Sequence, residues 1–150
     1  MNAPHIPYAE IGVTTNFSFL RGASHPQEYV AQAADYRMEA IGIADRNTLA
    51  GVVRGFAELE NDKLPGPAPK YLVGARLVFT DTTPDILAYP KDRASYGRLC
   101  RLITKGKLAT RESGQCILKL EDLLEFRLGL QLVLMPHAKL DEETLRLLDR

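Results

Sequence analysis

The sequence predicts an α/β protein with a largely parallel sheet or an incomplete (β/α) barrel. Short apolar segments alternate with amphipathic helical segments along the 150 residues. Most of the connections between successive apolar segments are too long for hairpins, as in parallel sheets. Because a closed (β/α) barrel usually takes on the order of 200 to 250 residues, the chain is expected to hold about half of one.

The first predicted strand is followed by a helix. Residues 11–13 form a short apolar strand. Ser24 and Gln27 have the S-x-x-Q spacing of a capping box, and Pro26 lies where a first helical turn tolerates proline. A helix is therefore expected to begin near residue 24.

A second strand and helix follow. An Ile-Gly-Ile strand ends at Asp45, and Asn47 or Thr48 is expected to cap the next helix. That helix stops before the Pro/Gly-rich loop 64–69. Its apolar stripe has helical spacing and consists of Leu49, Val52, Val53, Phe56 and Ala57.

The C-terminal half has the strongest strand signal, in residues 70–79. Residues 86–90 are expected to return beside this strand, and Asp92 is expected to cap a helix with one apolar face. A polar loop is predicted for residues 105–116. The remaining expected elements are a helix at 118–126, a strand at 130–136 and a closing helix at 141–149.

Composition excludes several classes of protein. The chain is 45% apolar and 25% charged, with 19 basic and 19 acidic residues, so net charge favours neither nucleic acid nor membrane. No apolar run approaches the roughly 18 residues of a membrane span, and the first residues do not resemble an export signal. Cys100 and Cys116 form no metal or redox motif, which indicates free thiols in the cytoplasm.

Polar residues gather at the carboxyl ends of the predicted strands, where α/β folds place functional groups. The first strand leads into residues 14–21 and the second into residues 45–47. The third contains Gly74, Ala75 and Arg76.

These three stretches, "VTTNFSFLRG", "IGIADRNTLAG" and "YLVGARL", resemble in order and spacing the first three motifs of the PHP (polymerase and histidinol phosphatase) domain family. More narrowly, they are similar to PHP domains at the N-terminus of the bacterial DNA polymerase III alpha subunit and its error-prone paralogue. The similarity continues through "YPKDRASYGRLCRLITKGK" and, more weakly, "LEDLLEF". The resemblance implies that residues 1–150 are an incomplete PHP-like domain, a fragment of a distorted seven-stranded barrel at the start of a longer polymerase chain.

The resemblance also implies a degenerate metal site. A metal-binding member of the family has His in place of Thr14, His or Asp in place of Asn16, and Asp or His in place of Arg21. It has His in place of Arg46 and Glu in place of Arg76. Since guanidinium offers no lone pair and stays cationic, no metal ligand and no catalytic residue is predicted in this chain.

Asp45 is the remaining polar position of the degenerate site, and it is expected to pair with one of the arginines. The resemblance then implies an inactive structural domain of an error-prone polymerase that acts in translesion synthesis and DNA repair. The expected partners are the remaining polymerase domains, with DNA bound through the full-length protein. Magnesium is expected only at a polymerase site outside this chain.

Two other functions stay open. One is a PHP-type phosphoesterase or exonuclease whose ligands come from other positions. The other is an arginine-based phosphate- or DNA-binding module, in which Arg21, Arg46 and Arg76 converge on the degenerate metal site. Its candidate contacts are Arg21, Arg46, Arg76, Arg98, Arg101 and Lys105.

An incomplete barrel also leaves a sheet edge without a neighbour. The edge is expected either to pair with a second copy of the chain or to be covered by residues 141–149, where Leu145 and Leu148 form an apolar stripe.

Overall fold

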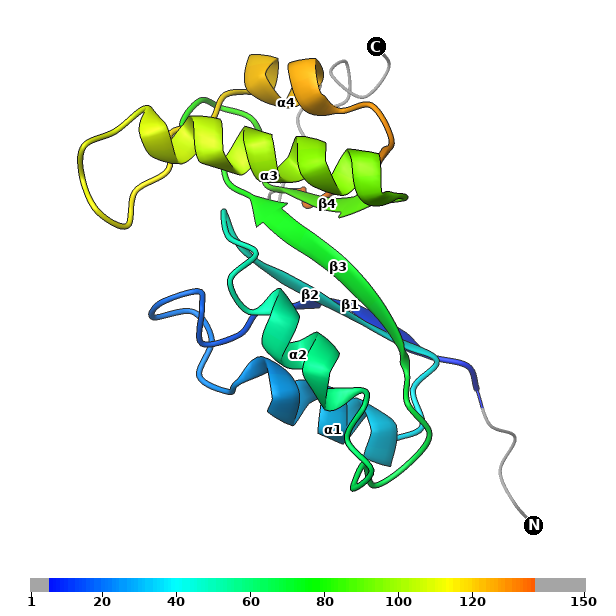
Figure 1. Cartoon of the computed structure of the whole chain (residues 1–150). Coiled ribbons are helices and arrows are strands. Elements are labelled where there is room, and N and C mark those ends of the chain that lie inside the picture. Colours follow the sequence, from blue (N-terminus) through cyan, green and yellow to red (C-terminus); the bar gives the residue numbers. More distant parts are fainter. Residues whose placement is uncertain (1–5, 137–150) are drawn as a thin grey trace. The chain divides into compact units, whose positions relative to one another are not determined.

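A computed structural model of the chain describes residues 6–136 (Figure 1). The chain divides into two compact units, Met1–Gly74 and Ala75–Arg150. The closing helix expected at 141–149 lies outside the described residues, so its contacts stay a prediction. Within residues 6–136, no helix is both long enough and apolar enough to cross a membrane.

The N-terminal unit is built from strand–helix pairs. Its elements are β1 (Ala9–Val13), α1 (Pro26–Asp35), β2 (Ala40–Arg46), α2 (Val52–Glu58) and the first part of β3 (Lys70–Leu77). β1 and β2 are parallel, with Ala9 opposite Ala40, as the sequence predicted for this part of the sheet. The core of the unit consists of Val13, Val30, Ala33, Ile41 and Ile43.

The helices of this unit begin later than predicted. The N-cap of α1 is His25, whose backbone N–H donates to the Glu28 carboxylate at 2.6 Å, so the capping box is shifted by one residue from Ser24. α2 begins at Val52, because Asn47 has a φ of 48° and the Thr48 hydroxyl accepts from the Ala50 N–H in a turn.

Up to residue 136, the C-terminal unit continues from β3 with two further strands and two helices. Its elements are β4 (Ile86–Pro90), α3 (Arg93–Leu108), α4 (Leu120–Phe126) and β5 (Leu130–Leu134). β4 is antiparallel to both β3 and β5. The prediction of largely parallel strands is therefore wrong for this unit. The link between Leu77 and Ile86 is shorter than the dozen or more residues that a parallel crossover needs.

α3 has the predicted cap and a greater length than predicted. The Ser95 N–H donates to the Asp92 carboxylate at 2.7 Å, and this bond holds the pKa of Asp92 below its ordinary value. The helix then continues through residues 105–108, which were expected in a loop. Gly106 allows this, because a β-carbon there would lie 2.6 Å from the Cys116 sulfur and 2.6 Å from the Leu118 side chain.

Candidate functional site

The loop between β1 and α1 meets the end of β2 at a buried carboxylate. Asp45 is 1% exposed. Its Oδ1 accepts from the Thr15 N–H at 2.8 Å and from the Ser18 hydroxyl at 2.6 Å. Its Oδ2 accepts from the Thr15 hydroxyl at 2.7 Å. Since Thr15 and Ser18 are themselves buried, three charge-assisted hydrogen bonds hold this loop against β2 without access to solvent.

The two hydroxyl groups extend this network to the backbone. The Ser18 Oγ accepts from the Arg46 N–H at 2.9 Å, and the Thr15 Oγ1 accepts from the Phe17 N–H at 3.2 Å. The loop also closes on itself at Gly22, where a β-carbon would lie 2.3 Å from the Thr15 carbonyl oxygen. We call Asp45, Thr15 and Ser18 the buried hydroxyl–carboxylate cluster.

Two neighbours define the surroundings of this cluster. A β-carbon on Gly51 would lie 3.2 Å from the Asp45 Oδ2, so the start of α2 passes close to the carboxylate. The Tyr71 hydroxyl donates to the Val52 carbonyl at 3.0 Å. Burial, and secondly the charge of Asp45, raise the pKa of Tyr71 above its ordinary value.

The structure brings together only part of the predicted site. Thr14, Asn16 and Arg21 lie on the β1–α1 loop, next to the end of β2 that carries Asp45 and Arg46. Within residues 6–136, Asp45 is not observed in an ion pair with an arginine, and it instead accepts hydrogen bonds from the hydroxyl and backbone donors of Thr15 and Ser18.

Sequence reasoning missed both hydroxyl residues of the cluster. A signal for Thr15 was present, since it follows the buried Val13 by two residues and strands alternate faces with that period. Nothing in the sequence pattern distinguished Ser18 from the exposed residues that follow it.

Arg76 has a carboxylate partner of its own. Its Nε lies 2.7 Å from the Asp85 Oδ2, and about a third of the Arg76 side chain is exposed. Arg76 belongs to the C-terminal unit, whereas Arg21 and Arg46 belong to the N-terminal unit. The convergence of the three arginines therefore stays a prediction.

The side chains at the strand ends do not fit a divalent-metal cluster. Thr14 and Asn16 offer neutral oxygens, Arg21 and Arg46 offer no lone pair, and Asp45 already accepts three hydrogen bonds. Among residues 6–136, no group of three or more His, Cys, Asp or Glu side chains is placed to hold a metal ion.

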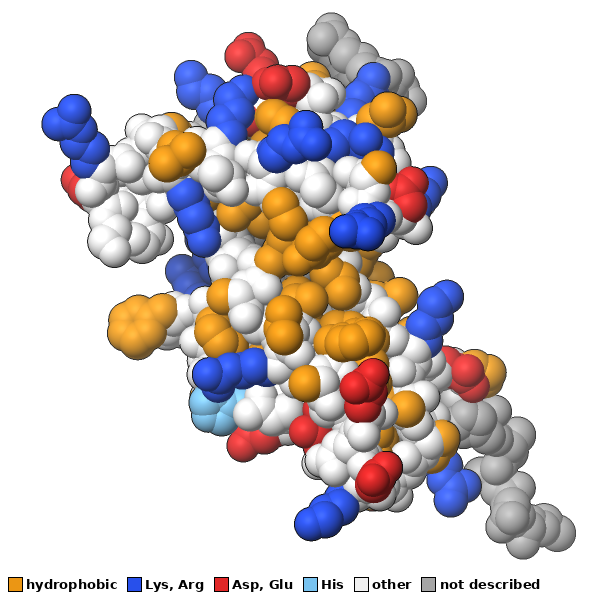
Figure 2. Space-filling view, viewed as in Figure 1, with side chains coloured by type: hydrophobic (Ala, Val, Ile, Leu, Met, Phe, Trp, Pro, Cys, Tyr) orange, Lys and Arg blue, Asp and Glu red, His pale blue; other side chains and the backbone are white. Residues whose placement is uncertain are grey.

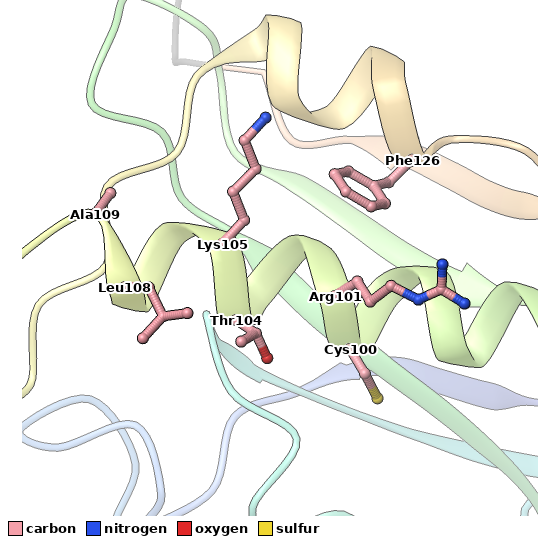
Figure 3. Close-up of a pocket in the computed structure, with 7 residues that line it drawn as sticks. All are labelled: Cys100, Arg101, Thr104, Lys105, Leu108, Ala109 and Phe126. Atoms are coloured by element: carbon pink, nitrogen blue, oxygen red, sulfur yellow. The ribbon is translucent and has the colours of Figure 1, made fainter.

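A second candidate region lies on α3 and α4. The Lys105 Nζ lies 2.7 Å from the Asp122 Oδ1 and 2.7 Å from the Glu125 Oε2. These contacts raise the pKa of Lys105 and lower that of Asp122. Figure 3 shows Lys105 pointing from α3 toward α4, where the Phe126 ring lies 5.8 Å from the ammonium group. Lys105 thus already forms ion pairs with two carboxylates, which argues against the predicted phosphate contact.

A cavity of about 660 Å³ opens beside this ion pair. It is lined by Cys100, Arg101, Thr104, Lys105, Leu108, Ala109 and Phe126 (Figure 3). Figure 2 shows Lys and Arg side chains gathered over α3. Arg98 donates from its Nε to the Leu128 carbonyl at 2.6 Å. The Arg101 side chain makes no hydrogen bond or ion pair within the described part of the chain, so its guanidinium is the predicted α3 cation best placed to meet an anion.

The fold and the strand-end motifs match one protein family. A family model described as the PHP domain matches residues 11–142. The chain therefore belongs to the PHP domain family.

Relatives within this family are much longer. The chain is 63% identical over 144 residues to a protein named error-prone DNA polymerase from Bradyrhizobium sp. (strain ORS 278). This match covers 93% of the chain and 12% of that protein. The chain thus spans about an eighth of the length of this relative.

Solved structures have the same fold. One is a candidate metal-dependent phosphoesterase from Bifidobacterium adolescentis, with a TM-score of 0.51 and 19% identity over 83% of the chain and 44% of that protein. Another is an amidohydrolase from Chromobacterium violaceum, with a TM-score of 0.52 and 17% identity over 67% of the chain and 34% of that protein. The predicted α/β partial-barrel class is confirmed.

Proposed function

We propose that this chain is the N-terminal part of the PHP domain of an error-prone DNA polymerase, and that it serves there as a structural, non-catalytic domain. The parent protein would act in translesion synthesis and DNA repair in the cytoplasm. Its polymerase carboxylates and their magnesium ions would lie beyond this sequence. The remaining polymerase domains would be its direct partners, and DNA would bind through the full-length protein.

The observation that carries this proposal is the environment of Asp45. In a metal phosphoesterase, a carboxylate at a strand end would meet a cation or its histidine ligands. Here its oxygens accept from Thr15 and Ser18 at 2.6 to 2.8 Å in a buried setting. The carboxylate thus stabilises the loop that a PHP metal site would use, and Arg21 and Arg46 offer no replacement ligands.

Elemental analysis of the purified chain tests the non-catalytic role. After dialysis against buffers containing zinc, manganese or magnesium, we expect well under one metal ion per chain and no hydrolysis of phosphomonoesters or single-stranded DNA. One tightly bound transition metal per chain, with an activity that disappears on its removal, would instead support the phosphoesterase alternative.

Arg101 supports a second candidate function, the binding of phosphate or DNA. α3 carries five basic residues and no acidic one, and Arg101 lines a cavity without a carboxylate partner among the described residues. Arg21, Arg46, Arg76 and Arg98 remain candidate contacts of the same kind. Lys105 contributes least, because of its ion pair.

Salt-dependent binding of single-stranded DNA tests this second function. If phosphates are bound, affinity should fall steeply as salt rises, and Arg101→Ala should reduce the slope by about one contact. Lys105→Ala is the matched control on the same helix and should leave the slope unchanged. A dissociation constant that changes neither with salt nor with the Arg101 substitution would exclude the binding of DNA through its phosphates.

A further inference from the structure

The β1–α1 loop presents two large apolar side chains to solvent at its tip. Phe19 is 84% exposed and Leu20 is 86% exposed, and both exceed every other large apolar residue of the N-terminal unit within residues 6–136. Arg21, which follows them, is exposed as well. We call Phe19, Leu20 and Arg21 the loop tip.

The buried cluster holds the loop tip in place through Ser18. The Ser18 carbonyl accepts from the Arg21 N–H at 2.9 Å and from the Gly22 N–H at 3.1 Å, which closes a tight turn around the tip. The same Ser18 anchors the turn to Asp45 through its hydroxyl. The two apolar side chains are therefore displayed on an ordered turn with a buried base.

The backbone of the tip is strained. Leu20 has a φ of 59°, in the left-handed region that residues with a β-carbon rarely occupy. Such a conformation persists where the surrounding structure imposes it, and here the hydrogen bonds at Ser18 do so. A preorganised pair of apolar side chains loses little conformational freedom on docking, which favours binding.

We propose that the loop tip is a docking element, and that it inserts Phe19 and Leu20 into an apolar pocket on the part of the same polymerase polypeptide that lies outside this sequence. This proposal rests on the proposed function. The length of that polypeptide supports the choice of occupant, since the chain spans 12% of its Bradyrhizobium relative and the rest is covalently attached at high effective concentration. The exposed Arg21 guanidinium predicts a carboxylate at the rim of the pocket.

Other occupants fit the tip less well. A stacking platform for single-stranded DNA uses the flat faces of aromatic rings, and the branched Leu20 side chain offers no such face. A second copy of the chain would need its own apolar pocket. In the N-terminal unit, four of the five side chains that line the cavity at Gln27, Arg54, Ala57, Glu58 and Asn61 are polar or charged. The more apolar cavity on α3 is bordered by Arg101 and Lys105, whose positive charges would oppose the approach of Arg21.

Hydroxyl-radical labelling of the full-length polymerase and of the 150-residue chain tests the docking. We expect labelling of Phe19 and Leu20 to fall about tenfold or more in the polymerase, because side chains in an interface core lose their contact with water. Val53, 72% exposed on α2, reports the labelling of an exposed apolar side chain in each sample.

Three results would overturn the docking: a smaller fall at the tip than this, protection that requires added single-stranded oligonucleotide, or protection in the isolated chain that rises with its concentration.

Paired substitutions give an independent measurement. Phe19→Ser with Leu20→Ser should leave the melting temperature of the isolated chain unchanged and lower that of the polymerase, whereas Val53→Ser should change neither. An unchanged polymerase would contradict the docking. Primer extension by the same full-length protein keeps the two proposals separate, since a polymerase that extends primers with an unprotected tip refutes the docking and leaves the proposed function intact.

Discussion

The two units of the chain each tie secondary-structure elements together through a carboxylate, in very different surroundings. In the N-terminal unit, Asp45 is buried and accepts only from uncharged donors of Thr15 and Ser18. In the C-terminal unit, Asp122 and Glu125 meet the Lys105 ammonium at the surface, where the Lys105 side chain is 46% exposed.

This contrast shows that pairing of formal charges is a poor guide to which contact stabilises the fold more. A buried carboxylate with three donors is costly to disrupt, because each donor would be left without water or a partner. An exposed ion pair exchanges readily with water and is screened by salt. We therefore expect the hydrogen bonds from the neutral partners of Asp45 to contribute more to the free energy of unfolding than the ion pairs of Lys105.

Removal of the buried carboxylate should have the largest effect. Asp45→Ala would leave the Thr15 N–H and two hydroxyls unsatisfied, and we expect it to lower the free energy of unfolding by about 3 to 5 kcal/mol. Native-state hydrogen exchange measures the stability of each unit separately, and we expect the loss to be confined to the N-terminal unit. Asp62→Ala, at an exposed position, is the control; an equal effect of both substitutions would refute the role of the cluster.

The sequence predicted the elements better than the site. Hydrophobic periodicity located nearly all the described helices and strands, because burial of one face determines where they form. The α2 start was displaced by local side-chain bonds at Thr48, and the antiparallel β4 followed from a short connection. The partners of Asp45 depend on contacts between residues about 30 positions apart, which no local pattern encodes.

Substitution of one glycine in each unit extends the comparison, because the two substitutions should change stability in opposite directions. Gly22→Ala would place a β-carbon 2.3 Å from the Thr15 carbonyl oxygen, and a backbone atom cannot rotate away. We expect a loss of about 1 to 3 kcal/mol in the free energy of unfolding. Gly97→Ala on α3 is the matched substitution, since its β-carbon meets nothing within 4 Å, and it should instead stabilise by about 0.5 to 1 kcal/mol.

Urea denaturation of the two glycine variants gives the signs directly. If both variants lose stability, α3 is more tightly packed at Gly97 than described. If both gain stability, the loop at Gly22 is open, and the close approach to Thr15 is wrong.

Substitution of Ser18 should lower the free energy of unfolding less than substitution of Asp45 or Gly22. Ser18→Ala removes one donor to Asp45 and the acceptor for the Arg46 N–H, and Asp45 keeps its two bonds from Thr15. We expect a loss of about 1 to 2 kcal/mol in urea denaturation, together with faster hydrogen exchange at the Arg46 amide. Ser24→Ala on the same loop is the control, and unchanged exchange at Arg46 in the Ser18 variant would contradict the assigned bond.

Removal of the ion pair in the C-terminal unit should have the smallest effect on stability, and this effect should depend on pH. The folded chain lowers the pKa of Asp122 below its ordinary 3.8 and raises that of Lys105 above its ordinary 10.5. The contribution of Asp122 is therefore present above pH 3.8 and lost as pH falls through the lowered value. The contribution of Lys105 is present below pH 10.5 and lost as pH rises through the raised value.

Lys105→Met should accordingly shift the urea midpoint less than Ser18→Ala at neutral pH. The difference from the unsubstituted chain should stay constant between about pH 5 and pH 9, shrink in acid as Asp122 is protonated, and decrease with added salt. Lys91→Met, at another exposed lysine, should show none of these trends. A Lys105→Met effect larger than that of Ser18→Ala would reverse the comparison, because it would mean that the surface ion pair stabilises its unit more than the buried hydroxyl contact stabilises the other.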